Sequence, residues 1–251
     1  MNTFSKKITI STVAAITLLT AIQSNAQLVF TGSGSDSDGS FTAQVTFTLS
    51  GDELKIVLEN TTDVGSGQWA AGLLASGVSF NVNGGTGADL NSGNGNIATM
   101  FTVAHGVNTY ANTGNGTILP QWQVQTSGHG TGFNVNLNLF NGEPGDMIIG
   151  NDSMGGTSGA GTYDINNSVY NHQPIVLGAG TFMVTVTNIT SLSQISDVVF
   201  NFGTQPGEGT ACGVPVPVPE PTTIISGALL LVPLSVQLMR KSWKRAQPKT
   251  D

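Results

Sequence analysis

The chain has 251 residues, a formal net charge of −7 and only 9% charged residues. Between Gln27 and Gly213 it carries thirteen acidic residues but a single basic one, Lys55. One cation cannot neutralise several phosphates, which excludes nucleic-acid binding by this part of the chain. The single cysteine, Cys212, cannot form an internal disulfide, and we expect it to be an unpaired residue in a linker. A chain of this length can bury a core without disulfides or metals.

The N-terminus has the pattern of a secretory signal peptide. Lys6 and Lys7 give a positively charged start, the apolar residues 8–22 follow, and small residues lead up to Ala26. Signal peptidase is therefore expected to cleave between Ala26 and Gln27, so that residues 1–26 are the signal peptide. The alternative is an anchor helix that is not cleaved.

A β-hairpin is the first element expected after this segment. Apolar residues alternate with small polar residues over 41–50, and the alternation resumes over 54–59. A period of two places one apolar face on a strand, and the intervening residues 50–53 have the composition of a turn. The two segments therefore predict two antiparallel strands joined by a tight turn.

The same alternation recurs along the chain and predicts an all-β domain. Clear strand patterns cover 78–82, 133–139, 182–186 and 198–202, and weaker ones cover 28–30, 97–103, 118–124, 146–149 and 175–177. One short helical turn is expected near 69–74, and glycine- and asparagine-rich loops are expected at 83–96, 112–116 and 150–161. No segment has a helical apolar stripe, so we expect an antiparallel two-sheet β-sandwich, jelly-roll-like, over residues 27–213.

The C-terminus has the pattern of a membrane anchor. Residues 214–221 alternate proline with other residues and predict an extended linker. The 18 residues from 222 to 239 are uncharged and long enough to cross a bilayer as one transmembrane helix. The tail 240–251 begins with a basic cluster, which favours a cytoplasmic location and places the preceding domain outside the cytoplasm. The residues of this cluster are Arg240, Lys241, Lys244 and Arg245.

The order of Val-Pro-Glu-Pro, apolar span and basic cluster resembles the C-terminal sorting signal of the PEP-CTERM proteins of Gram-negative bacteria. The resemblance covers residues 218–245. It implies that an exosortase-type membrane protease recognises Pro219, Glu220 and Pro221 and cleaves near them. It also implies an association with the cell surface and with exopolysaccharide.

These features predict an exported, non-enzymatic surface or extracellular-matrix protein. It would be anchored in the inner membrane with its ectodomain outside the cytoplasm, and would reach the cell surface or the medium after processing. The expected partners are signal peptidase, the exosortase-type protease, the membrane and exopolysaccharide, and no cofactor is expected. Two alternatives stay open: a carbohydrate-binding module for cell-surface exopolysaccharide, and a secreted hydrolase with an unrecognised site.

Candidate metal ligands are few. Asp36 and Asp38 lie in a sequence similar to part of a calcium loop, but the glycine and glutamate positions of an EF-hand are not met. A solvated turn is the preferred interpretation. His105, His129 and His172 have no short metal-ligand spacing, so no zinc site is expected.

Candidate catalytic and sugar-binding residues also have simpler explanations. Glu143 and Asp146 could be paired carboxylates for glycoside hydrolysis, but their glycine- and proline-rich surroundings favour a turn. Trp69, Trp122 and Tyr110 could stack on sugars, and packing in the core is the preferred interpretation.

Overall fold

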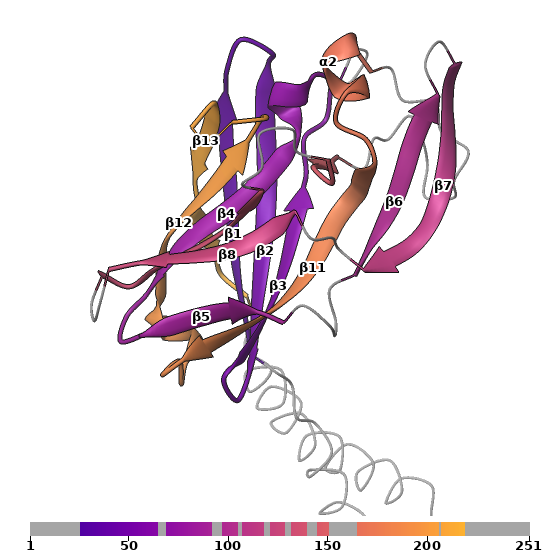
Figure 1. Ribbon diagram of the computed structural model, residues 1–251. Coiled ribbons are helices and arrows are strands. Elements are labelled where there is room, and N and C mark those ends of the chain that lie inside the picture. Colours follow the sequence, from indigo (N-terminus) through magenta and orange to yellow (C-terminus); the bar gives the residue numbers. More distant parts are fainter. Residues whose placement is uncertain are drawn as a thin grey trace, which may run out of the picture. The chain divides into compact units, whose positions relative to one another are not determined.

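The structure is a computed structural model, shown in Figure 1. It describes residues 26–64, 69–91, 97–104, 107–117, 121–128, 132–139, 145–150, 165–205 and 207–218, with the backbone alone at 97, 99, 101–104 and 107–117. Contacts group Gln27–Val218 as one compact unit, separate from residues 1–26 and 219–251. The predicted transmembrane helix lies outside the described residues. Within the described ranges, no helix has the length and apolar character needed to cross a membrane.

The described part of the chain is mostly β-structure with three single-turn helical segments. The strands are β1 (Gln27–Ser35), β2 (Ser40–Ser50), β3 (Glu53–Asn60), β4 (Ala75–Val82), β5 (Gly87–Leu90), β6 (Ile97–Ala104), β7 (Val107–Thr117), β8 (Trp122–Ser127), β9 (Asn134–Leu139), β10 (Ile148–Ile149), β11 (Ile175–Thr187), β12 (Ile195–Phe202), β13 (Gly209–Cys212) and β14 (Val214–Val216). The helical segments are η1 (Ala71–Leu73), α2 (Asn167–Tyr170) and η3 (Leu192–Gln194).

The predicted hairpin is confirmed as β2 and β3. Gly51 has a φ of 66° in the turn between them, a conformation that glycine adopts without a steric penalty. Residues of β2 and β3 alternate between buried and partly exposed, as the period of two in the sequence requires. The other clear strand predictions correspond to β4, β9, β11 and β12, and the helical turn expected near 69–74 corresponds to η1.

Four strands lie where no strand was expected, and these expectations were wrong. β5 and part of β7 occupy segments predicted as loops, and β13 lies in a segment for which no strand was predicted. β14 occupies the first residues of the predicted proline-rich linker. The sheet therefore extends to Val216, closer to the predicted sorting motif than the sequence indicated.

The fourteen strands form one large mixed sheet that is mainly antiparallel. Its main order is β13-β12-β4-β10-β11-β3-β2-β1-β14, with β5, β6, β7, β8 and β9 attached beside this path. β10 pairs parallel with β11 and antiparallel with β4, so it joins the two halves of the order. β13 and β14, which are the two ends of this strand order, follow each other in the chain with only Gly213 between them.

Strands that are distant in the sheet order pack against each other through the core. Phe41 of β2 stacks on Phe202 of β12 with ring centroids 4.2 Å apart. Phe47 of β2 meets Phe80 of β4 edge to face at 5.0 Å. In Figure 1, β4 and β8 cross in front of β1 and β2. One continuous apolar cluster therefore contains residues from both halves of the strand order.

Candidate functional site

The two chain ends of the compact unit meet at one edge of the sheet. β14 pairs antiparallel with β1, and Val216 lies opposite Val29. Gln27 lies two residues before Val29 and Val218 two residues after Val216, so both lie at the same end of this strand pair. The residue expected to follow signal cleavage and the residue that precedes the predicted sorting motif are therefore neighbours.

The alternation of valine and proline in β14 has a structural explanation. On β2, the Thr42 N–H donates to Thr62 Oγ1 and its carbonyl accepts from the Thr61 N–H, so these groups face away from β1. In an antiparallel ladder, two residues that lie opposite each other turn their backbone groups either toward each other or away from each other. The β1 residue opposite Thr42, and every second residue from it along β1, therefore turns its backbone groups away from β2 and toward β14. Val29 and Thr31 therefore direct their backbone groups toward β14, where they meet Val216 and Val214.

Pro215 then has its nitrogen on the outer edge of β14, where no hydrogen bond is required. Proline is confined to such positions in sheets because it cannot donate to a ladder. It also protects the edge, because an outer edge without N–H groups cannot pair with a strand of another molecule. The Val-Pro pattern thus ends the sheet at the place where the chain leaves for the predicted anchor.

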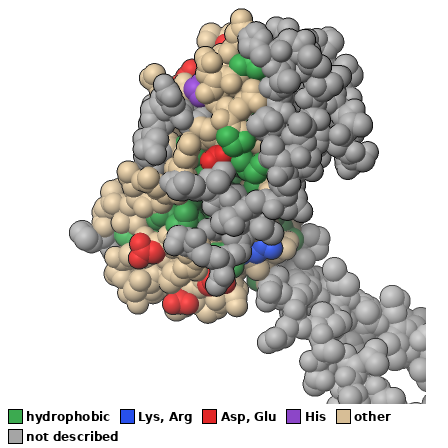
Figure 2. Space-filling view, turned by 45° about the vertical axis from the view of Figure 1, so that its right-hand side comes forward, with side chains coloured by type: hydrophobic (Ala, Val, Ile, Leu, Met, Phe, Trp, Pro, Cys, Tyr) green, Lys and Arg blue, Asp and Glu red, His purple; other side chains and the backbone are tan. Residues whose placement is uncertain are grey.

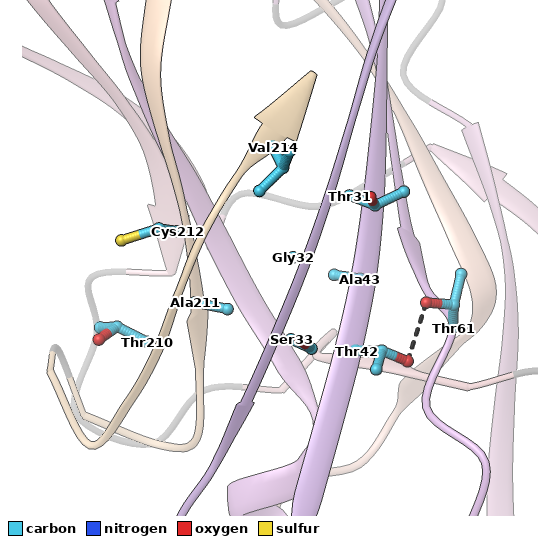
Figure 3. A pocket seen from close by; sticks show the side chains of 10 residues that line it. All are labelled: Thr31, Gly32, Ser33, Thr42, Ala43, Thr61, Thr210, Ala211, Cys212 and Val214. Atoms are coloured by element: carbon cyan, nitrogen blue, oxygen red, sulfur yellow. Dashed lines mark hydrogen bonds between the residues drawn. The ribbon is translucent and has the colours of Figure 1, made fainter. Parts of the chain in front are cut away.

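A groove of about 670 Å³ lies beside this edge, and Figure 3 shows its lining. β1 contributes Thr31, Gly32 and Ser33, β2 contributes Thr42 and Ala43, and Thr61 adds a hydroxyl that donates to Thr42 Oγ1 at 3.0 Å. The remaining lining residues are Thr210, Ala211, Cys212 and Val214. Glycine at position 32 permits the close approach of β13, because a Cβ there would lie 3.1 Å from the carbonyl oxygen of Cys212.

The groove has a mixed lining that is more apolar than polar. None of the described lining residues is charged. Cys212 is exposed, and in Figure 3 its sulfur points away from β1. The lining offers hydroxyl groups and backbone atoms, but it contains no base that could activate a nucleophile. The described lining can hold a small uncharged group.

The two residues of the weak calcium candidate act in a turn. Asp36 Oδ1 accepts hydrogen bonds from the backbone N–H groups of Asp38 at 2.8 Å and Gly39 at 3.2 Å. Asp38 Oδ2 accepts from the Gly72 N–H at 3.1 Å and so ties the turn to η1. No group of three or more His, Cys, Asp or Glu within the described ranges could hold a metal ion. Figure 2 shows acidic side chains scattered over the face that it draws.

Asp146 is buried at the centre of a tight connection. Its side chain is 2% exposed, and Oδ1 has no hydrogen-bond partner among the described residues. Its backbone N–H donates to the Pro174 carbonyl at 2.6 Å, and its carbonyl accepts from Trp122 Nε1 at 3.1 Å. Burial raises the pKa of Asp146 to about 6. The φ of 64° confirms a turn-like backbone, as the glycine- and proline-rich sequence indicated.

The two described tryptophans are core residues and not sugar platforms. Trp69 is 0% exposed and Trp122 is 2% exposed. Trp122 also packs against Phe182 with ring centroids 4.6 Å apart. The possibility that these residues stack on a sugar is therefore wrong for both, because neither indole face is accessible.

The other candidate residues are not brought together by the described structure. His172 is half-buried, and its Nδ1 has no hydrogen-bond partner among the described residues. His105, His129, Glu143 and the side chain of Tyr110 lie outside the description. The sorting motif Pro219, Glu220 and Pro221 and the basic cluster Arg240, Lys241, Lys244 and Arg245 also lie outside it. Ala26 and Gln27 are exposed at the start of β1.

Comparison of the chain with known protein families, with curated proteins and with solved structures finds no match.

Proposed function

We propose that this chain is an exported surface or extracellular-matrix protein that is tethered to the inner membrane and then cleaved at its Pro-Glu-Pro motif. The N-terminal segment would direct export and the C-terminal segment would hold the ectodomain outside the cytoplasm. An exosortase-type protease would act on Pro219, Glu220 and Pro221. The ectodomain would act through binding or assembly and not through catalysis.

One observation supports this proposal most strongly. The compact unit begins at Gln27, directly after the predicted signal cleavage site, and ends at Val218, directly before Pro219. The limits of the compact unit come from contacts between residues. The predicted processing sites come from charge, hydropathy and the order of the motifs, which are separate criteria. Removal of both terminal segments would leave the compact unit whole, as a processed ectodomain requires.

We also infer a two-layered, jelly-roll-like arrangement within the connected sheet. The stacking of Phe41 on Phe202 and the contact between Phe47 and Phe80 support two facing layers, since each pair joins strands that are not neighbours in the sheet order. β10 and Gly213 would then be the two places where the layers join. This arrangement would fix the edge formed by β1 and β14 at the point where the chain continues toward Pro219.

The two alternative functions have less support. A carbohydrate-binding module would have to use the uncharged groove, because Trp69 and Trp122 are buried. A hydrolase would need a nucleophile and a base in contact, and the groove lining contains no such pair. Neither alternative explains why the compact unit stops at the predicted processing sites.

Glu220→Ala in the full-length chain, expressed in a host that carries the protease, tests the proposal. The variant is expected to stay in the membrane at full length, because the recognition motif is lost, whereas the native protein is released and shorter. Asp52→Asn is the matched control, since Asp52 is an exposed acid in the turn between β2 and β3. Equal size and equal location of the native protein and Glu220→Ala would overturn the sorting mechanism.

A further inference from the structure

The outer face of one half of the sheet carries little charge in its three middle rows, and the next row along β3 carries Glu53. It is formed by β14, β1, β2, β3 and β11, whose other face packs into the core. Cross-strand partners point to the same side of a sheet, so the register divides this face into rows. The central row contains Val216, Val29, Thr46, Val57 and Thr181. Three of these five side chains are valines, and the other two are threonines, which also carry a methyl group.

The two rows beside the central row have opposite character. One row contains Gln27, Thr48, Lys55 and Met183. The other row contains Val214, Thr31, Gln44, Glu59 and Ala179. Lys55 and Glu59 are the only charged residues in the three rows, so these rows are neutral, whereas residues 27–213 carry thirteen acids and one base. Two molecules of such an acidic protein repel each other least when these faces meet.

We propose that this face is the interface of a homodimer whose two-fold axis runs along the central row. Rotation about an axis in the interface plane and perpendicular to the strands places each residue of the central row opposite its own copy. It also exchanges the two neighbouring rows. Val57 and Val29 then pack against the same residues of the second copy.

The exchange of rows makes the face complementary to itself. Lys55 lies opposite Glu59 of the second copy, and Glu59 lies opposite its Lys55, so two equivalent ion pairs form. Met183 lies opposite Ala179 of the second copy, which pairs a long side chain with a short one. Thr48 lies opposite Gln44 of the second copy, and the two can share a hydrogen bond.

The three rows set the size of the face. Five strands at about 4.8 Å spacing and five residues at about 3.3 Å rise give a face of roughly 24 by 17 Å. A face of that size buries about 400 Å² per copy, which is at the low end for a specific complex. The membrane anchor would strengthen the dimer by raising the effective concentration of the copies, although the dimer does not depend on the proposed sorting.

Cross-linking of the full-length chain in membranes tests the interface. Val57→Cys in a Cys212→Ser background places one thiol on the axis, opposite its copy. Oxidation is expected to give a covalent dimer on a non-reducing gel. The matched control is Gln125→Cys in the same background, because Gln125 is exposed on β8, outside the proposed interface, and is expected to cross-link only by chance collisions.

Charge exchange then tests the pairing itself. Lys55→Glu or Glu59→Lys, added singly to Val57→Cys, places like charges opposite each other and is expected to reduce dimer formation about tenfold. The double variant Lys55→Glu and Glu59→Lys is expected to restore it. Lys55 and Glu59 have Thr48, Met183, Gln44 and Ala179 as cross-strand neighbours within one chain, so the exchange breaks no registered charge pair in the monomer.

Three results would overturn the dimer. One is cross-linking of Val57→Cys at no more than the level of Gln125→Cys, and another is failure of the double exchange to restore what the single variants lose. The third is protection of the thiol in Val57→Cys from a maleimide reagent without a covalent dimer, which would show that polysaccharide, lipid or another protein covers the face instead.

Discussion

The Asn60 side chain donates a hydrogen bond to the carbonyl oxygen of Ile148 at 2.8 Å, although 88 positions separate the two residues. The same Nδ2 donates to the Leu73 carbonyl at 2.9 Å, and Oδ1 accepts from the Thr62 N–H at 3.0 Å. Asn60 is 1% exposed, so these bonds satisfy an amide that would otherwise be costly to bury. One side chain therefore connects the end of β3, η1 and the short strand β10 that joins the two halves of the sheet.

Asn60→Leu is expected to lower the free energy of unfolding by about 3 kcal/mol, because it leaves two buried carbonyls and one N–H without partners. Urea denaturation of the variant measures this loss. Gln125→Leu on the exposed strand β8 is the control and should change stability by less than about 0.5 kcal/mol. Equal midpoints for the native protein and Asn60→Leu would show that the amide does not hold the junction.

Gly32→Ala is expected to destabilise the fold by about 1–3 kcal/mol through overpacking. A Cβ at this position would lie 2.6 Å from the ring of Phe200 and 3.1 Å from the Cys212 carbonyl oxygen. Phe200 is 0% exposed, so its ring cannot move away. Thermal unfolding should separate this variant from Gly132→Ala, where a Cβ would meet nothing within 4 Å. A normal unfolding temperature for Gly32→Ala would mean that β13 does not pack closely on β1.

Asp146 is expected to make the fold less stable as pH rises from about 4 to about 6. Burial raises the pKa of Asp146 to about 6 from 3.8, so the folded state keeps this proton where the unfolded chain has lost it. Ionisation then favours the unfolded state, and the native protein loses up to about 3 kcal/mol between these pH values. The loss is complete above about pH 6, where the carboxylate is ionised in both states.

Asp146→Asn should abolish this part of the pH dependence, since the amide has a similar shape, does not ionise and tolerates a positive φ. Urea midpoints at about pH 4 and about pH 7 measure the difference between variant and native protein. Gln125→Leu on β8, which changes no titratable group, should leave the native pH dependence unchanged. A native pH profile in Asp146→Asn would show that this carboxyl is solvated.

Replacing both Pro215 and Pro217 by valine is expected to promote self-association through the edge of β14. The substitutions restore N–H groups on the outer edge and leave Val214 and Val216 paired with β1. Light scattering should show a concentration-dependent increase in mass. Val214→Thr and Val216→Thr keep the prolines and should not aggregate. An unchanged mass for the variant that lacks both prolines would show that Pro215 and Pro217 do not protect the edge.

The sequence predicted the parts of the fold in which burial alternates strictly. Over 41–49 and 54–58 every second residue is apolar, and this pattern follows directly from one buried face, although Val57 adds an apolar residue on the other face. β7 escaped prediction because its sequence, with four asparagines and glycines between 112 and 116, has too few apolar residues to show a face. β14 escaped because its proline was taken as a signal for a linker, whereas an edge strand accepts proline. β13 has only four residues, too few to show an alternating pattern.

The candidate site was less accessible to sequence reasoning. The register that brings Val29 opposite Val216 joins the two ends of the domain, and no local pattern reports such a long-range pairing. The burial of Trp69 and Trp122 depends on neighbours far along the chain, so their residue type alone could not exclude a sugar site. The alternation of valine and proline after Gly213 was the one available signal for β14, because every second residue lacks an N–H.

Mass spectrometry of both termini of the mature protein, isolated from cells that express the full chain and the protease, tests the proposed export and processing most directly. The proposal predicts an N-terminus at Gln27 and a C-terminus close to Pro219, Glu220 and Pro221, so that the recovered chain is the compact unit Gln27–Val218 with at most a few added residues. Recovery of an intact chain from Met1 to Asp251 in the cytosol would contradict it.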